Sequence, residues 1–62
     1  MKYPEAAYIA AGHQYERATT PAATQARAGI IRTMLESENI DDRAEARRLI
    51  EAGRAEARRA PA

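Results

Sequence analysis

The stretch TPAATQARAGIIRTML, residues 20–35, decides the fold. Thr20 is a residue type that caps helix N-termini, because its side-chain oxygen accepts a hydrogen bond from a free backbone N–H. Pro21 suits the first helical position, where its missing N–H and its fixed φ carry no penalty. Apolar residues then recur with a helical period as far as Leu35. The stretch predicts a helix at about 21–36.

Proline and asparagine mark the limits of the neighbouring segments. The first helix is predicted at about 4–18, with Pro4 at its start and Glu5 in the first turn, where a negative charge meets the positive end of the helix dipole. This helix ends before Pro21, because the residue that precedes a proline avoids the α region. Asn39 is expected to close the second helix by adopting the left-handed conformation.

A third helix is predicted at about 42–59 and is the longest of the three. Asp41 or Asp42 is expected to cap its N-terminus. With Asp42 as the cap, Glu45 stands at the third helical position and completes a capping box. Ile40, just before the cap, is placed for a hydrophobic staple against the helix that follows.

The composition leaves little material for a core. Sixteen of the 62 residues are alanine, and valine, phenylalanine and tryptophan are absent. A core in a chain this short rarely supplies more than about 3–5 kcal/mol. The pattern predicts an all-α fold, a small bundle or open helical array, in one small domain at 1–62 with loose residues at both termini. We expect a homodimer or a complex with another protein to complete the core. The large aliphatic residues are Ile9, Ile30, Ile31, Met34, Leu35, Ile40, Leu49 and Ile50.

Each segment has one apolar face when its residues are projected at 100° per residue. The second segment is apolar over the widest arc, so we expect it to be the central helix. The third segment ends in small residues, which either pack on the Tyr8 and Tyr15 face of the first helix or wait for a partner. The three stripes consist of Tyr8, Ala11, Gly12, Tyr15 and Ala18; of Ala23, Ala26, Ile30 and Met34, widened by Ile31 and Leu35; and of Ala46, Leu49, Ile50, Gly53, Ala57 and Ala60.

Candidate catalytic groups are few. The chain has one histidine and no cysteine, too few ligands of the kinds that zinc sites use. A general base at His13 needs an orienting partner, and Glu16 lies within reach of it. The only serine, as a candidate nucleophile, is Ser37. The acidic residues of 36–42 lack the order of a calcium-binding loop. We expect His13 to be a surface or partly buried helix residue, with no catalytic, cofactor or metal site and no small-molecule substrate.

No apolar run approaches the length that crosses a bilayer, and the first residues lack the apolar core of a signal peptide. The absence of cysteine fits a reducing compartment. We therefore expect a cytoplasmic protein with no membrane partner.

The small core and the scarcity of candidate catalytic groups favour a non-enzymatic protein–protein interaction module. Such a module would be a small regulator or inhibitor that acts through helix–helix contacts. Tyrosine is favoured at interfaces, where one end of the ring is dry and the other is wet. Small residues on a helix let a partner helix approach closely. The candidate partner-binding residues are Tyr8, Tyr15, Leu35, Leu49 and Gly53.

The alternative is a small nucleic-acid-binding transcriptional regulator that uses the arginine-rich third helix. Guanidinium groups bind phosphates in a bidentate manner, but glutamates stand between the arginines at spacings that form intrahelical pairs. A pI near 8.2 is also below that of a typical nucleic-acid-binding domain. The candidate nucleic-acid-binding residues are Arg43, Arg47, Arg54 and Arg58. The expected pairs are Arg47–Glu51, Glu45–Arg48, Glu51–Arg54 and Glu56–Arg59.

Overall fold

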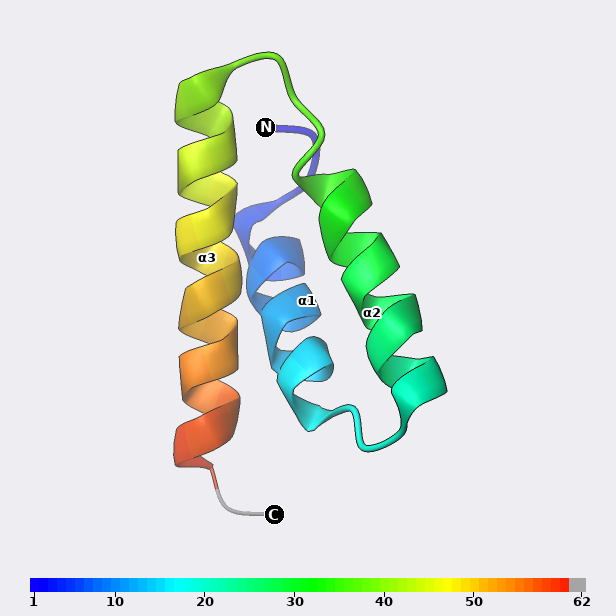
Figure 1. Ribbon diagram of the computed structural model, residues 1–62. Coiled ribbons are helices and arrows are strands. Elements are labelled where there is room, and N and C mark those ends of the chain that lie inside the picture. Colours follow the sequence, from blue (N-terminus) through cyan, green and yellow to red (C-terminus); the bar gives the residue numbers. More distant parts are fainter. Residues whose placement is uncertain (61–62) are drawn as a thin grey trace.

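The computed structural model describes residues 1–60 and shows three α-helices with short connections (Figure 1). The all-α three-helix prediction is confirmed, and every predicted helix end lies within two residues of the observed one. The third helix is the longest, with 20 residues. No helix within the described part of the chain is long and apolar enough to cross a membrane. The helices are α1 (Glu5–Arg17), α2 (Pro21–Met34) and α3 (Ile40–Arg59).

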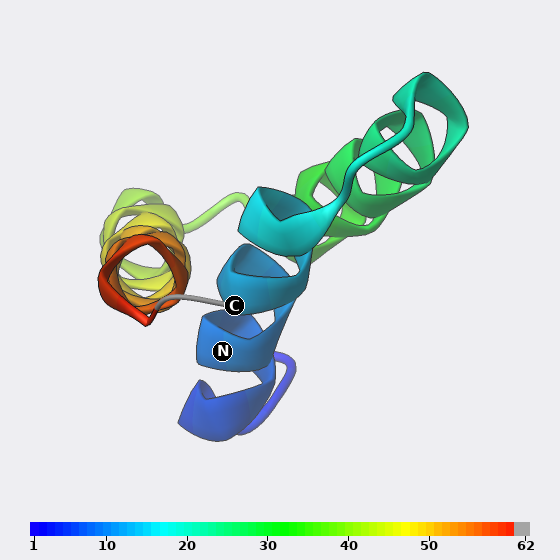
Figure 2. The ribbon, with the colours of Figure 1, turned by 90° about the horizontal axis from the view of Figure 1, so that it is seen from below.

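The central helix is α1. It packs along α3 on one side and against α2 on the other, whereas α2 and α3 touch only marginally. Figure 2 shows this arrangement from below, with α1 between its two neighbours. The prediction that the second helix is central was wrong. A wide apolar arc does not by itself place a helix in the middle: on α2 only Met34 is buried, and Ile30 remains 46% exposed.

Two glycines let the backbones of α1 and α3 meet. A Cβ built on Gly12 would overlap the carbonyl oxygen of Ile50 and lie 2.8 Å from its carbonyl carbon. A Cβ built on Gly53 would meet Ile9 in the same way, again at 2.8 Å from the carbonyl carbon. Only glycine fits at these two positions. The small-residue half of α3 therefore packs on α1, the first of the two expected arrangements.

The core lies between α1 and the first half of α3, and Met34 of α2 closes one end of it. Tyr8 is its most buried large side chain, only 1% exposed, and its ring meets that of Tyr3 edge to face at 5.9 Å between centroids. The stripes predicted on the first and third helices supply nearly all of this core. The buried hydrophobic residues are Tyr8, Ala11, Met34, Ala46, Leu49 and Ile50.

The caps explain where α2 and α3 begin. Thr20 caps α2 as predicted, and its Oγ1 accepts a hydrogen bond from the N–H of Ala23 at 3.1 Å. On α3 the cap is Asn39, whose Oδ1 accepts from the N–H groups of Asp41 at 2.8 Å and Asp42 at 3.1 Å. The predicted aspartate caps were therefore wrong, and so was a left-handed Asn39, whose φ is −87°. The two aspartates instead lie in the first turn of α3, where their charge meets the helix dipole.

This earlier start changes the roles of two further residues. Ile40 becomes the first residue of α3 and is 70% exposed, so the predicted hydrophobic staple was wrong. Glu45 does not complete a capping box, because the helix begins five residues before it. Its carboxylate instead accepts two hydrogen bonds from Arg48, at 2.7 and 2.8 Å.

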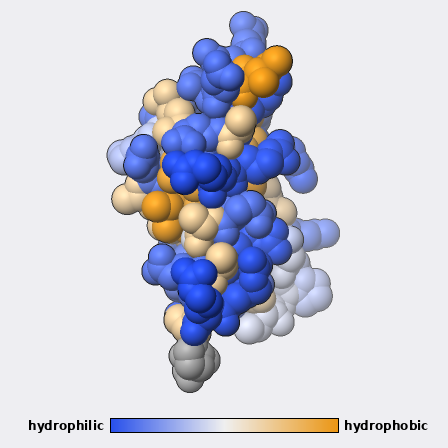
Figure 3. All heavy atoms as spheres, turned by 90° about the vertical axis from the view of Figure 1, so that its left-hand side faces the viewer, coloured by the Kyte–Doolittle hydropathy of each residue, from blue (hydrophilic) through white to orange (hydrophobic). Residues whose placement is uncertain are grey.

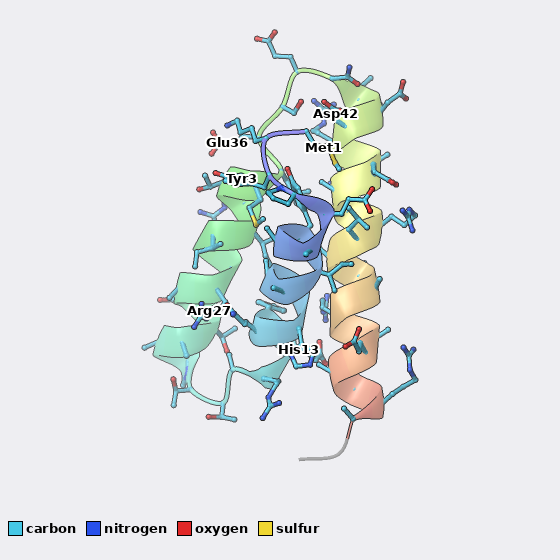
Figure 4. The ribbon with its side chains drawn as sticks, turned by 180° about the vertical axis from the view of Figure 1, so that it is seen from behind. Met1, Tyr3, His13, Arg27, Glu36 and Asp42 are labelled. Atoms are coloured by element: carbon cyan, nitrogen blue, oxygen red, sulfur yellow. The ribbon has the colours of Figure 1, made fainter. Side chains whose placement is uncertain are left out.

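The N-terminal segment lies across the end of the bundle where α2 and α3 are joined (Figure 4). The amino group of Met1 is 3.6 Å from a carboxylate oxygen of Asp42. The side chains of Met1 and Lys2 line a small hollow there together with Tyr8 and Met34. This end of the core is therefore covered by the chain itself.

Candidate protein-docking groove

An open groove lies between α2 and α3. It exists because both helices pack on α1 while touching each other only marginally. Seen from below, α2 and α3 stand on different sides of α1 (Figure 2). The α2–α3 groove has a volume of about 230 Å³ and is lined by Tyr15, Ala28, Ile31, Leu35, Arg47, Ile50, Glu51 and Arg54.

The α2 side of the groove is apolar. Ala28, Ile31 and Leu35 follow one another at i, i+3 and i+7, so they form one stripe along the helix. Ile31 and Leu35 are half-buried and pack against the core, with part of each side chain left open to the groove. Ile50 faces them from α3. This surface matches the apolar stripe of an additional helix.

The α3 side of the groove carries charge. Arg54 is held there: its Nε donates to Glu16 Oε2 at 2.9 Å, and its Nη1 donates to Glu51 Oε1 at 3.1 Å. Its guanidinium carbon also lies 5.0 Å from the ring centroid of Tyr15, a cation–π distance. Arg47 differs from Arg54 in having no partner of this kind. Its side chain is exposed, and no carboxylate within residues 1–60 lies within ion-pair distance of its guanidinium group.

Glu16 ties the C-terminal end of α1 to α3. Its carboxylate accepts from Arg54 and also from Arg58, at 3.2 Å, and its side chain is 23% exposed. The hydrogen bond from Arg54 is the main cause that holds the pKa of Glu16 below its ordinary value, and both guanidinium charges add to it. The same pairing raises the pKa of Arg54. These contacts fix the C-terminal half of α3 against α1 on one side of the groove.

We expect Glu16→Gln to lower the melting temperature by a few degrees near neutral pH. The folded-state pKa of Glu16 lies below the unfolded value, so the pair stabilises the protein above about pH 4.3. That contribution is lost as the pH falls through the lowered pKa. Thermal melts followed by circular dichroism from about pH 7 to about pH 3 should therefore show that acid lowers the melting temperature of the variant less than that of the parent protein.

The matched control is Glu56→Gln, which removes one carboxylate from α3 and breaks no ion pair among residues 1–60. If Glu16→Gln and the control had the same melting temperature and the same acid response, the Glu16 contacts would contribute nothing in solution.

The predicted partner-binding residues separate into two groups. Tyr15 and Leu35 line the α2–α3 groove. Tyr8 and Leu49 are core residues, and Gly53 is buried against α1, so none of these three faces a partner while the fold is intact. Projection of a single segment shows which face is apolar, but not whether a neighbouring helix covers that face.

Three groove residues were not among the predicted site residues: Ala28, Ile31 and Ile50. A signal for the first two was present in the sequence. Their spacing to Leu35 is that of a helical stripe, set to one side of the stripe that contains Met34. Two apolar stripes on one helix indicate two packing surfaces. The chain itself covers the one that contains Met34.

The arginines proposed for nucleic-acid binding lie along one side of α3, because their spacings of 4, 7 and 4 residues return to the same face. Three of them already have partners within the chain. Arg43 donates to the carbonyl oxygen of Ser37, while Arg54 and Arg58 hold Glu16. The outer face of α3 is largely hydrophilic with isolated hydrophobic residues (Figure 3).

Two of the four predicted intrahelical pairs are formed. Glu45–Arg48 and Glu51–Arg54 have shortest N–O distances of 2.7 and 3.1 Å. In the part of the chain that the structure describes, Arg47–Glu51 and Glu56–Arg59 are not within ion-pair distance.

His13 lies half-buried on α1, facing the C-terminal half of α3 (Figure 4). It lines a shallow hollow with Ile9 and Glu56, away from the α2–α3 groove. Ser37 acts in the turn before α3, where its hydroxyl accepts a hydrogen bond from the N–H of Asn39 at 3.1 Å. Across residues 1–60 no group of three or more histidine or carboxylate side chains is placed to hold a metal ion.

Comparison of the chain with protein-family models, with curated proteins and with solved structures gives no match.

Proposed function

We propose that this protein is a non-enzymatic interaction module whose α2–α3 groove binds an amphipathic helix of another protein. The supporting observation is the apolar lining of the groove. Ile31 and Leu35 of α2 are half-buried and line a space that no described part of the chain fills, beside the almost fully buried Ile50 of α3. A small regulator or inhibitor would use this surface to capture one helix of its target.

The separation of α2 and α3, which both pack on α1, supports a helix as the occupant. Packed helices lie about 8–10 Å apart and insert the side chains of one into the grooves of the other. A helix laid in the α2–α3 groove contacts both of its walls at once, as well as Tyr15 on α1. The chain would then become a four-helix bundle, and the open side of its small core would be covered.

Charge disfavours α2 of a second copy of this chain as the occupant. The α2 segment contains Arg27 and Arg32 and no aspartate or glutamate. If α2 of a second copy entered the groove, its arginines would approach Arg47 and Arg54 on the α3 side. Like charges brought together in a partly dry groove oppose association.

A pair of designed peptides tests the groove. Each is an alanine-rich helix about five turns long, with leucine along one stripe, a fluorescent label, and either glutamate or lysine on both flanks of the stripe. We expect at least one peptide to bind with micromolar affinity in fluorescence anisotropy. Ile31→Ser should weaken that binding about tenfold or more, because a large apolar contact is lost.

Ile30→Ser is the matched control, because Ile30 is the neighbouring isoleucine on the same helix, 46% exposed and outside the groove. Circular dichroism confirms that both variants are folded. If neither peptide binds the parent protein, or if both variants lose binding equally, the helix-binding function is wrong. If sedimentation shows a dimer that Ile31→Ser dissociates and Ile30→Ser does not, the occupant is a second copy.

A further inference from the structure

We propose that Arg47 selects the partner, so that the α2–α3 groove prefers a helix with carboxylates along the edge next to α3. This inference rests on the proposed helix-binding function and adds the chemistry of the occupant.

The α3 side of the groove carries two arginines with different roles. Arg54 is committed within the chain, because Glu16 and Glu51 accept its hydrogen bonds and Tyr15 lies beside its guanidinium group. Arg47 is two turns earlier, lines the same groove, and has no carboxylate partner among the described residues. A guanidinium group binds a carboxylate through two parallel hydrogen bonds. Arg47 is thus the residue whose charge is left for a partner.

The α2 side of the groove adds positive charge, and α2 contains no carboxylate to balance it. Arg32 is exposed and lies one turn after Ala28, at the outer edge of the apolar stripe. A helix in the groove would therefore lie between unbalanced cations on both sides. Glutamate or aspartate on its flanks would be attracted, and lysine or arginine would be repelled.

The apolar lining distinguishes this occupant from nucleic acid, which is also anionic. A phosphate backbone brings no apolar surface to cover Ile31 and Leu35. Three of the four arginines on that side of α3 already have partners within the chain. A carboxylate-bearing amphipathic helix satisfies the apolar stripe and Arg47 together.

The test measures the affinity of the glutamate-flanked and lysine-flanked peptides for three proteins: the parent, Arg47→Glu and Arg59→Glu. We expect the parent to prefer the glutamate peptide by about tenfold, the value of one charge-assisted hydrogen bond. Arg47→Glu should abolish or reverse this preference. Arg59→Glu makes the same change of charge on α3 outside the groove and should keep the preference.

The outcomes separate the two proposals. Equal binding of both peptides to the parent overturns the selection by Arg47 and leaves the helix-binding groove in place. Failure of both peptides to bind overturns the groove itself. Binding of a short DNA duplex with a steep dependence on salt, lost in Arg47→Glu, would overturn the carboxylate helix in favour of nucleic acid.

Discussion

The Gly12→Ala variant is expected to lose much of its folding stability. Its new methyl group would overlap the carbonyl oxygen of Ile50, so α1 and α3 must separate along their closest contact. Overpacking of this kind costs about 1–3 kcal/mol or more when backbone, rather than a flexible side chain, is in the way. The stability available to so small a core is about 3–5 kcal/mol. Circular dichroism at increasing temperature should show a melting temperature well below that of the parent protein.

Gly29→Ala is the matched control, because a Cβ at Gly29 meets nothing within 4 Å. Alanine is a better helix former than glycine by about 1 kcal/mol, which corresponds to a rise in melting temperature of about 4–8 °C. The two substitutions make the same chemical change within helices and should have opposite effects. A Gly12→Ala variant as stable as the parent would mean that α1 and α3 do not meet backbone to backbone.

The Tyr8→Ala variant is expected to lose about 3–5 kcal/mol of folding free energy, the usual cost of removing a large buried aromatic side chain. Tyr8 is only 1% exposed and belongs to the cluster that joins α1, α2 and α3. Because that loss equals most of the stability such a domain has, chemical denaturation should show a small folded fraction even without denaturant.

Ile40→Ala provides the comparison for Tyr8→Ala. Ile40 is a large apolar residue but is 70% exposed, so its removal should change the free energy of unfolding by less than about 1 kcal/mol. Similar losses in the two variants would contradict the core described here and would place Ile40 in a contact made by another molecule.

The helices could be predicted because their signals are local. Thr20 and Pro21 fix the start of α2 through backbone geometry and one capping bond, and the structure shows that bond. The start of α3 could not be fixed in the same way. Asn39, Asp41 and Asp42 are all residue types that cap helices, and the choice of Asn39 lets both aspartates meet the helix dipole.

The packing order could not be read from amphipathic faces, because such a face does not identify its partner. Gly12 and Gly53 were the relevant signal, since each is a glycine within the apolar stripe of a predicted helix. In the structure each one allows the backbone of the other helix to approach. Their pairing explains why α1, with few large side chains, is nevertheless central.

The candidate site was predicted only in part for the same reason. Tyr15 and Leu35 line the α2–α3 groove, whereas Tyr8 and Leu49 fill the core. Among the arginines, only the three-dimensional arrangement separates Arg47 from those that Glu16 and the Ser37 carbonyl hold. Glu16 lies 38 residues from Arg54 in the chain, and no local pattern connects them.

The contact between Gly12 and Ile50 also determines when the nascent chain can fold during synthesis. A ribosome releases the first two helices well before the third, yet the first helix rests mainly on the third. Until residues near 50 have emerged, the nascent chain exposes the apolar face of its first helix. Folding of these three helices must therefore wait until most of the third helix has left the ribosome.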